Sequence, residues 1–148
     1  VQPTHATSDK AMAETRVGAD RLQGAYAWRT LKKSGARIAL GSDFPVEPVN
    51  PFWGLHAAVT RQDRDDQPPG GWRPEEVLTL QQALAGFTVD AAYAGHMEGK
   101  VGALTEGHWA DFILLDRDPF TIGPAELKQV GVEETWLAGK RVYVKKAN

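Results

Sequence analysis

The chain has 148 residues, of which 42% are hydrophobic and 24% are charged, and its formal net charge is −2. A chain of this size and composition can bury one ordinary core, so we expect an ordered globular fold. The small net charge gives no broad attraction to nucleic acid or to an anionic membrane, and no apolar run approaches the about 18 residues that cross a bilayer. The absence of cysteine excludes disulfides, thiol nucleophiles and thiolate metal sites.

The start of the chain carries no targeting information. It begins at Val1 without an initiator methionine, so we expect a piece of a longer polypeptide. The cellular compartment therefore stays open, with the cytoplasm as the default expectation.

The first 40 residues predict a strand, a helical stretch and a second strand. Residues 1–5, VQPTH, predict a short strand that ends at a proline turn. Residues 8–34 predict two helices, with a break near Gly18 and a C-terminal cap at Gly35. Residues 36–40, ARIAL, form a short apolar run and predict a buried strand. This order is the unit of a parallel sheet.

Helices are predicted in the middle of the chain. Residues 51–61, PFWGLHAAVTR, place apolar side chains at helical spacing, and Pro51 suits the first turn. A polar loop rich in proline and glycine follows over residues 62–71. Thr79 and Gln82 then have the spacing of a capping box, which predicts the start of another helix.

The C-terminal part of the chain predicts β structure. The stretch ADFILLD, residues 110–116, predicts a buried strand, and residues 134–145, ETWLAGKRVYVK, predict a hairpin. Gly139 and Lys140 are expected to form its two-residue loop, because a type II′ turn has glycine first.

Asp43 is the first candidate for chemistry. It follows the predicted strand 36–40, and the carboxyl ends of parallel strands are where α/β sheets and barrels carry their functional side chains. An aspartate before a proline can instead cap a turn by bonding a backbone amide. The spacing alone leaves both interpretations open.

Five stretches of the sequence together resemble a known family. They are QPTH, VGADRLQGAYAWRTLKKSG, GSDFPVEPVNPFWGLHAAVTR, ALAGFTVDAAYAG and GALTEGHWADFILLDRDP. Their order and spacing are similar to the C-terminal portion of the amidohydrolase superfamily, in the branch of N-substituted formamide deformylase. The resemblance implies an α/β fold in which residues 1–98 are the last two strands and helices of a (β/α)₈ barrel. Residues 99–148 would be the C-terminal strands of a small composite β-sandwich domain.

The resemblance also implies roles for two residues. Asp43 matches the aspartate of the eighth barrel strand, which binds a divalent metal, here expected to be zinc. It also takes a proton from the metal-bound water that attacks an amide or formamide carbonyl. The other metal ligands would lie upstream, outside this chain. His5 matches a histidine that contacts substrate, although a histidine at a strand end is as often a turn residue.

The implied partners are a small amide-type substrate, the missing N-terminal portion of the same protein and further copies of the chain. A second interpretation of the chain is a truncated module without catalytic activity, which self-associates through the exposed edge of its half barrel. A His-x-His strand end in the upstream reading frame would favour the enzyme. A start codon just before Val1 would favour the module.

The sequence gives less specific predictions for other side chains. Arg61 could point toward the site or pair with a nearby aspartate, but we expect an exposed cation at a helix end. We place His56 on a helix flank, His96 near a helix end and His108 in a turn. The five tryptophans are scattered through the sequence and are expected to pack in the core and between domains.

Overall fold

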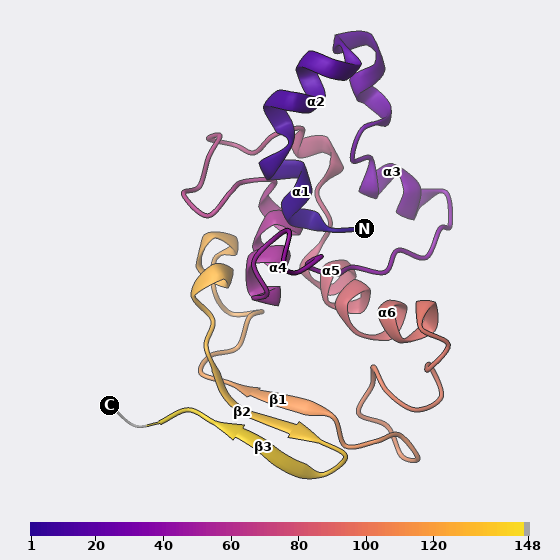
Figure 1. Cartoon of the computed structure of the whole chain (residues 1–148), viewed down its shortest axis with the longest axis vertical. Helices are drawn as coiled ribbons and strands as arrows, with labels where there is room; N and C mark the ends of the chain where they lie inside the picture. The colour runs from indigo at the N-terminus through magenta and orange to yellow at the C-terminus, as the bar shows by residue number, and fades with distance from the viewer. Residues whose placement is uncertain (147–148) are drawn as a thin grey trace.

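The computed structural model describes residues 1–146 and consists of a helical region followed by a small antiparallel sheet (Figure 1). The α-helices are α1 (Pro3–Ser8), α2 (Lys10–Val17), α3 (Trp28–Lys33), α4 (Pro51–Thr60), α5 (Leu80–Phe87) and α6 (Val89–Ala94). The 3₁₀ helices are η1 (Ala19–Gly24), η2 (Pro74–Glu76) and η3 (Pro124–Gln129), and the strands are β1 (Phe112–Leu115), β2 (Val132–Leu137) and β3 (Lys140–Val144).

The two segments predicted to be parallel strands are paired by one bridge only. The amino group of Val1 donates to the Ala39 carbonyl at 2.7 Å, and the Gly41 amide donates to the Val1 carbonyl at 3.1 Å. This pair of bonds is the pattern of a parallel ladder between Val1 and Leu40. The predicted strand over residues 1–5 is otherwise wrong, because helix α1 begins at Pro3.

The predicted burial of residues 36–40 holds for Ile38 and Leu40 but not for Arg37, which is exposed. The segment is not a strand, because within the described chain only Val1 pairs with it in this way. Ile38 and Leu40 are buried at 7% and 6% exposure. The Leu40 amide donates to the carbonyl of Gly86 in α5 at 2.9 Å. A Cβ on Gly86 would lie 2.5 Å from the Leu40 Cγ, so the segment that leads to Asp43 rests directly on α5.

The predicted helix between residues 20 and 34 is divided. The break at Gly18 (φ 80°) and the end at Gly35 (φ 90°) are confirmed. Between η1 and α3, however, the chain is extended at Ala25 and turns at Tyr26 with a φ of 52°. The helix is interrupted because arginine side chains from elsewhere in the chain bind carbonyl oxygens in this stretch.

The middle helices begin where the sequence predicts. The Asn50 side chain accepts a bond from the Phe52 amide at 3.0 Å, and Pro51 occupies the first turn of α4. Both bonds of the capping box between Thr79 and Gln82 are present at the start of α5, at 3.0 and 3.2 Å. At Thr88 the backbone leaves helical geometry and separates α5 from α6.

The strands form an antiparallel sheet in the order β1, β2, β3 (Figure 1). Strand β1 is confirmed, but its predicted burial is wrong, since Ile113 and Leu114 are 43% and 46% exposed. The hairpin is also confirmed, with its loop one residue earlier than predicted. Leu137 pairs with Lys140, and the loop residues Ala138 and Gly139 both have positive φ, as in a type I′ turn.

One core cluster joins the helical region to the segment between β1 and β2. Its buried members include Trp28, Leu40, Phe52 and Leu55, and Val130 joins it from the C-terminal part of the chain. In the part of the chain that the structure describes, no helix is long and apolar enough to cross a membrane.

Candidate functional site

Asp43 ends the extended segment over α5 and begins a tight turn. Its φ is 61°, a left-handed conformation that aspartate tolerates better than most residues. Its backbone carbonyl accepts a bond from the Val46 amide at 2.8 Å, and its side chain is 46% exposed.

The turn at Asp43 does not use the Asp43 carboxylate. The Ser42 hydroxyl accepts the bond from the Phe44 amide at 3.3 Å. Among the hydrogen bonds between residues 1 and 146, none runs from a backbone amide to the Asp43 side chain. The turn-capping alternative is therefore not realised in this geometry, and both carboxylate oxygens remain available.

His5 brings an imidazole beside this carboxylate. It lies in the first turn of α1, and its Nε2 is 3.5 Å from Asp43 Oδ2. The same Nε2 is buried and makes no hydrogen bond within the described residues. A buried polar atom without a hydrogen bond is costly, and the Asp43 carboxylate at 3.5 Å is the charged group within reach of this nitrogen.

The pair contains two kinds of group that can bind divalent metals. One carboxylate oxygen and one imidazole nitrogen are donors that suit a borderline cation such as zinc, which takes about three or four protein ligands. No group of three or more candidate ligands occurs among residues 1–146. The donor types fit a divalent ion, and the donor number requires further ligands.

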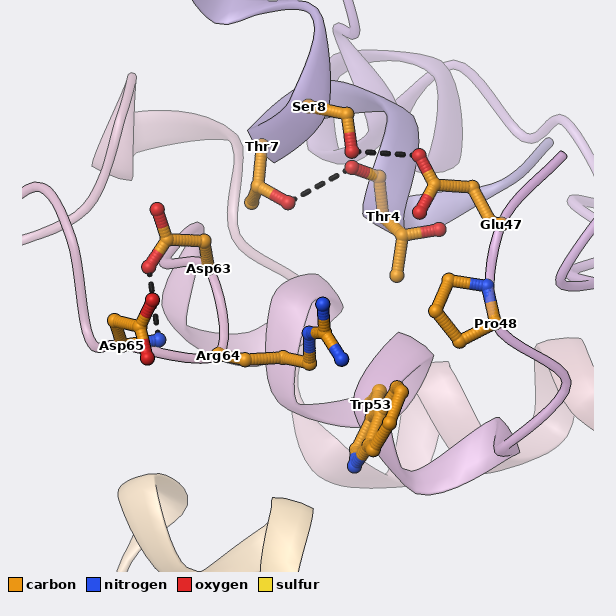
Figure 2. Close-up of a pocket in the computed structure, with 9 residues that line it drawn as sticks. All are labelled: Thr4, Thr7, Ser8, Glu47, Pro48, Trp53, Asp63, Arg64 and Asp65. Carbon is orange, nitrogen blue, oxygen red and sulfur yellow. Dashed lines mark hydrogen bonds between the residues drawn. The ribbon is translucent and has the colours of Figure 1, made fainter.

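A polar pocket of about 270 Å³ lies beside α1 and α4 (Figure 2). It is lined by Thr4, Thr7, Ser8, Glu47, Pro48, Trp53, Asp63, Arg64 and Asp65. Several of these groups are already engaged: the Ser8 hydroxyl donates to Glu47 at 2.5 Å, and Asp63 binds Lys10 at 2.9 Å. Burial raises the pKa of Asp63, but bonds from the Gln67 amide and Lys10 outweigh this and lower it.

A second pocket of about 220 Å³ includes His5 itself. It is lined by Val1, Gln2, His5, Gly24, Tyr26, Ala27, Trp28 and Leu31. Its walls are largely apolar, in contrast with those of the polar pocket. The two pockets place neighbouring residues of α1, Thr4 and His5, in different surroundings.

The prediction of an exposed Arg61 is wrong. Its side chain is fully buried, with the guanidinium carbon 4.2 Å from the ring centre of Trp28 and 5.3 Å from that of Trp72. It donates to the carbonyls of Trp72 at 2.9 Å and Tyr26 at 3.1 Å. The left-handed cap conformation of Arg61 (φ 60°) ends α4 at this point. Burial lowers the pKa of Arg61 to about 10, which leaves it charged at neutral pH.

His56 is also placed differently from its prediction. It is 1% exposed inside α4, and its ring nitrogens face the carbonyls of Pro124 at 3.2 Å and Asp63 at 3.1 Å. It therefore links α4 to η3 as a structural contact. The predicted positions of His96 near the end of α6 and of His108 in a turn are confirmed.

The tryptophans divide between core and surface. Trp28 and Trp72 are buried in the core, and Trp136 stacks on Phe112 with 5.5 Å between ring centres. Trp109 is 49% exposed. The aromatic environment of Arg61 was not predicted, because only folding brings Trp28 and Trp72 against its side chain.

The family model described as "Amidohydrolase family" matches residues 1–143. The chain belongs to the amidohydrolase family. It is 37% identical over 145 residues to the Bacillus subtilis protein YtcJ, an amidohydrolase by name, covering 98% of this chain and 27% of that protein. It is 30% identical over 115 residues to N-substituted formamide deformylase of Arthrobacter pascens, covering 78% of this chain and 21% of the relative.

Two solved structures of metal-dependent hydrolases share the fold of this chain. An uncharacterized metal-dependent hydrolase from Pyrococcus horikoshii has a TM-score of 0.73 and 31% identity, covering 84% of this chain and 25% of that one. One from Pyrococcus furiosus has a TM-score of 0.66 and 34% identity, covering 80% and 23%. This chain thus spans about a quarter of the length of the relatives that it matches.

Proposed function

We propose that this chain is the C-terminal part of a metal-dependent hydrolase that cleaves a C–N bond, with Asp43 as metal ligand and proton acceptor. One observation carries the proposal: the Asp43 carboxylate is free of its own turn and lies 3.5 Å from the unpartnered Nε2 of His5. The single parallel bridge between Val1 and Leu40 supports a further element of the proposal, that these segments are the last two strands of a (β/α)₈ barrel.

The residues of this chain would contribute two actions. When bound, a divalent ion, which we expect to be zinc, would polarise the substrate carbonyl and lower the pKa of a coordinated water toward neutrality. Asp43 would hold the ion with one oxygen and accept the proton of the attacking water with the other. His5 would contact the substrate, and its nearness to Asp43 would keep both groups oriented toward one reacting bond. The remaining ligands would come from the preceding part of a longer protein.

The substrate class rests on both chemistry and comparison. A proton acceptor beside a divalent ion suits hydrolysis of an unreactive carbonyl such as that of an amide. The Arthrobacter relative is named for N-substituted formamides, which supports an amide or formamide substrate here.

The test is the substitution Asp43→Asn in the full-length protein. Asparagine is nearly isosteric but neither carries the charge nor accepts the proton, so kcat should fall by about two orders of magnitude or more. Turnover of N-acyl and N-formyl amines should be measured together with metal content.

Asp118 provides a matched control. Its carboxylate accepts a bond from the Phe120 amide at 2.9 Å, so it is an aspartate that does cap a turn. Asp118→Asn should leave turnover unchanged. Near-normal turnover by Asp43→Asn would refute the assignment of Asp43.

A self-associating module is the second candidate. Strand β3 is exposed along its whole length and carries Val142, Tyr143 and Val144, each about half exposed. An open strand edge of this kind is a template for pairing with another chain.

A further inference from the structure

We propose that the apolar pocket beside His5 binds the apolar substituent of the amide substrate and so sets which amides are accepted. The inference rests on the proposed function and deepens it. It concerns the 220 Å³ pocket between the N-terminal residues and the segment from Gly24 to Leu31.

The chemistry of the pocket walls selects an apolar group. Trp28 is 2% exposed and Ala27 is 9% exposed, and both present apolar surface to the pocket. Tyr26 contributes its ring, because its hydroxyl already donates to Asp9 at 2.8 Å. Leu31 is 45% exposed, so its side chain gains from being covered by a bound group.

His5 connects the pocket to the reacting bond. It lines the pocket and lies 3.5 Å from Asp43. A substrate whose carbonyl lies at this pair can therefore extend an apolar substituent along the His5 ring into the pocket. The chemistry and the selection of the substrate would share one residue.

Two arginine side chains hold the pocket wall that contains Gly24, Tyr26 and Trp28. Arg61 donates to the Tyr26 carbonyl at 3.1 Å. Arg73 donates to the carbonyls of Leu22, Gln23 and Ala25. Two arginines thus fix the backbone of the segment that supplies Gly24, Tyr26 and Trp28. A wall held in this way binds a ligand without first being ordered, which favours affinity.

The polar pocket on the other side of α1 does not suit the same substituent. The Glu47 and Asp63 carboxylates line this space. An apolar substituent that covered these carboxylates would remove water from them without supplying hydrogen bonds in return, which is costly. The contrast between the two pockets places the substituent beside Tyr26 and Trp28.

Gly24 offers a way to fill the pocket. A Cβ at Gly24 meets no atom within 4 Å, and the glycine does not have a positive φ, so a side chain can start there without a clash at its Cβ or backbone strain. Gly99 has the same two properties and lies away from the pocket, which makes it a matched control. Leu31→Ala changes the pocket in the opposite sense by removing an apolar wall.

The experiment compares an N-benzyl amide with the corresponding N-methyl amide in the metal-loaded full-length protein. Gly24→Leu should lower kcat/KM for the N-benzyl amide, relative to that for the N-methyl amide, by about tenfold or more. This is the usual effect of a few carbon atoms in a substrate pocket. Leu31→Ala should lower the same ratio by a smaller factor, and Gly99→Leu should not change it. Calorimetric titration with N-benzylurea and N-methylurea, which are not expected to be cleaved, gives a binding readout that does not depend on turnover.

The outcomes separate the two proposals. Loss of N-benzylurea affinity in Gly24→Leu and Leu31→Ala supports the pocket, even if no amide is hydrolysed and the proposed function fails. An unchanged selectivity ratio and unchanged affinity in both variants, with amide hydrolysis intact, overturns the pocket and leaves the proposed function standing.

Discussion

Residues 1–98 bury Trp28, Phe52 and Leu55 to 3% exposure or less, whereas the sheet leaves Ile113 and Val142 at 43% and 51%. The helical region buries these side chains among its own residues and η3, although others, such as Leu31 and Phe44, stay exposed. In the sheet, by contrast, no residue of the three strands is buried, and both outer strands expose apolar side chains.

The charged groups show the same difference. Arg61 is buried between two tryptophans and bonded to two carbonyls, while Arg117 is an exposed side chain paired with its neighbour Asp116 at 3.0 Å. Burying a charge is costly unless it is hydrogen-bonded. Arg61 bonds carbonyls through Nε and Nη1, whereas its Nη2 has no partner among the described residues. The sheet has no comparable interior, and we expect it to need another surface to complete it.

The largest expected effect comes from replacing the buried cation. Arg61→Met leaves the carbonyls of Tyr26 and Trp72 without their donors and should destabilise the surrounding structure by about 3 kcal/mol. Amide hydrogen exchange in the full-length protein should accelerate over residues 22–30. Arg117→Met should leave exchange near β1 almost unchanged, because exposed pairs contribute little. Equal protection in wild type and Arg61→Met would contradict the role given to Arg61.

A smaller effect is expected where α5 meets the segment before Asp43. The added carbon of Gly86→Ala would lie 2.5 Å from Leu40 Cγ and 3.2 Å from the Ile38 carbonyl, so it should cost about 1–3 kcal/mol. Gly99→Ala, which meets open space, should stay within about 0.5 kcal/mol of wild type. Urea unfolding midpoints of the two variants measure the difference. Similar midpoints would mean that the close approach of Gly86 to Leu40 is absent.

Acid should weaken the helical region through Glu76. Burial raises its pKa, but bonds from Thr30 and the charge of Arg73 outweigh this and hold it below 4.5. A lowered folded-state pKa gives stability that is present above the unfolded pKa and is lost as pH falls through the folded one. Glu76→Gln should therefore reduce stability at neutral pH and flatten its decline in acid.

Asp116 is the comparison for Glu76 in the sheet region. Its pKa is also lowered, chiefly by a bond from Arg117, but in an exposed position where solvent screens the interaction. Asp116→Asn should change the acid dependence of the urea midpoint less than Glu76→Gln does. The reverse order would contradict the contrast between the two regions.

Local chemistry explains the parts of the fold that the sequence predicts well. The capping box at Thr79 and Gln82, the cap at Asn50 and the glycine breaks depend on residues a few positions apart. The predictions that are wrong depend on distant partners. Residues 36–40 have the sequence pattern of a strand but pair only through Val1. The helix before Trp28 is interrupted where its carbonyls accept bonds from arginines that lie about 35 or more residues later in the chain.

The candidate site also has features that depend on nearby residues and features that depend on distant ones. Asp43 is identified by its position after an apolar segment, and the structure adds that His5 lies beside it and that Ser42 carries the turn. The burial of Arg61 and His56 was not predicted, because it arises from side chains and carbonyls that only folding brings together. The assignments of Asp43 and His5 to metal and substrate stay predictions.

The smallest expected change in stability is on β3, and it tests whether the sheet is unfinished. Val144 and Tyr143 are consecutive in the regular part of the strand and lie on opposite faces, while Val142 lies where the ladder to β2 shifts register. Replacing both valines by lysine should alter unfolding by only about 0.5 kcal/mol, because both are about half exposed. The isolated 148-residue chain should nevertheless self-associate as wild type and shift toward monomer in this double variant, since charges on an edge strand oppose pairing between chains. Tyr143→Lys places the same charge on the other face and shows which face is used. Sedimentation velocity measures all three proteins, and a monodisperse wild-type monomer would mean that the sheet needs no partner surface.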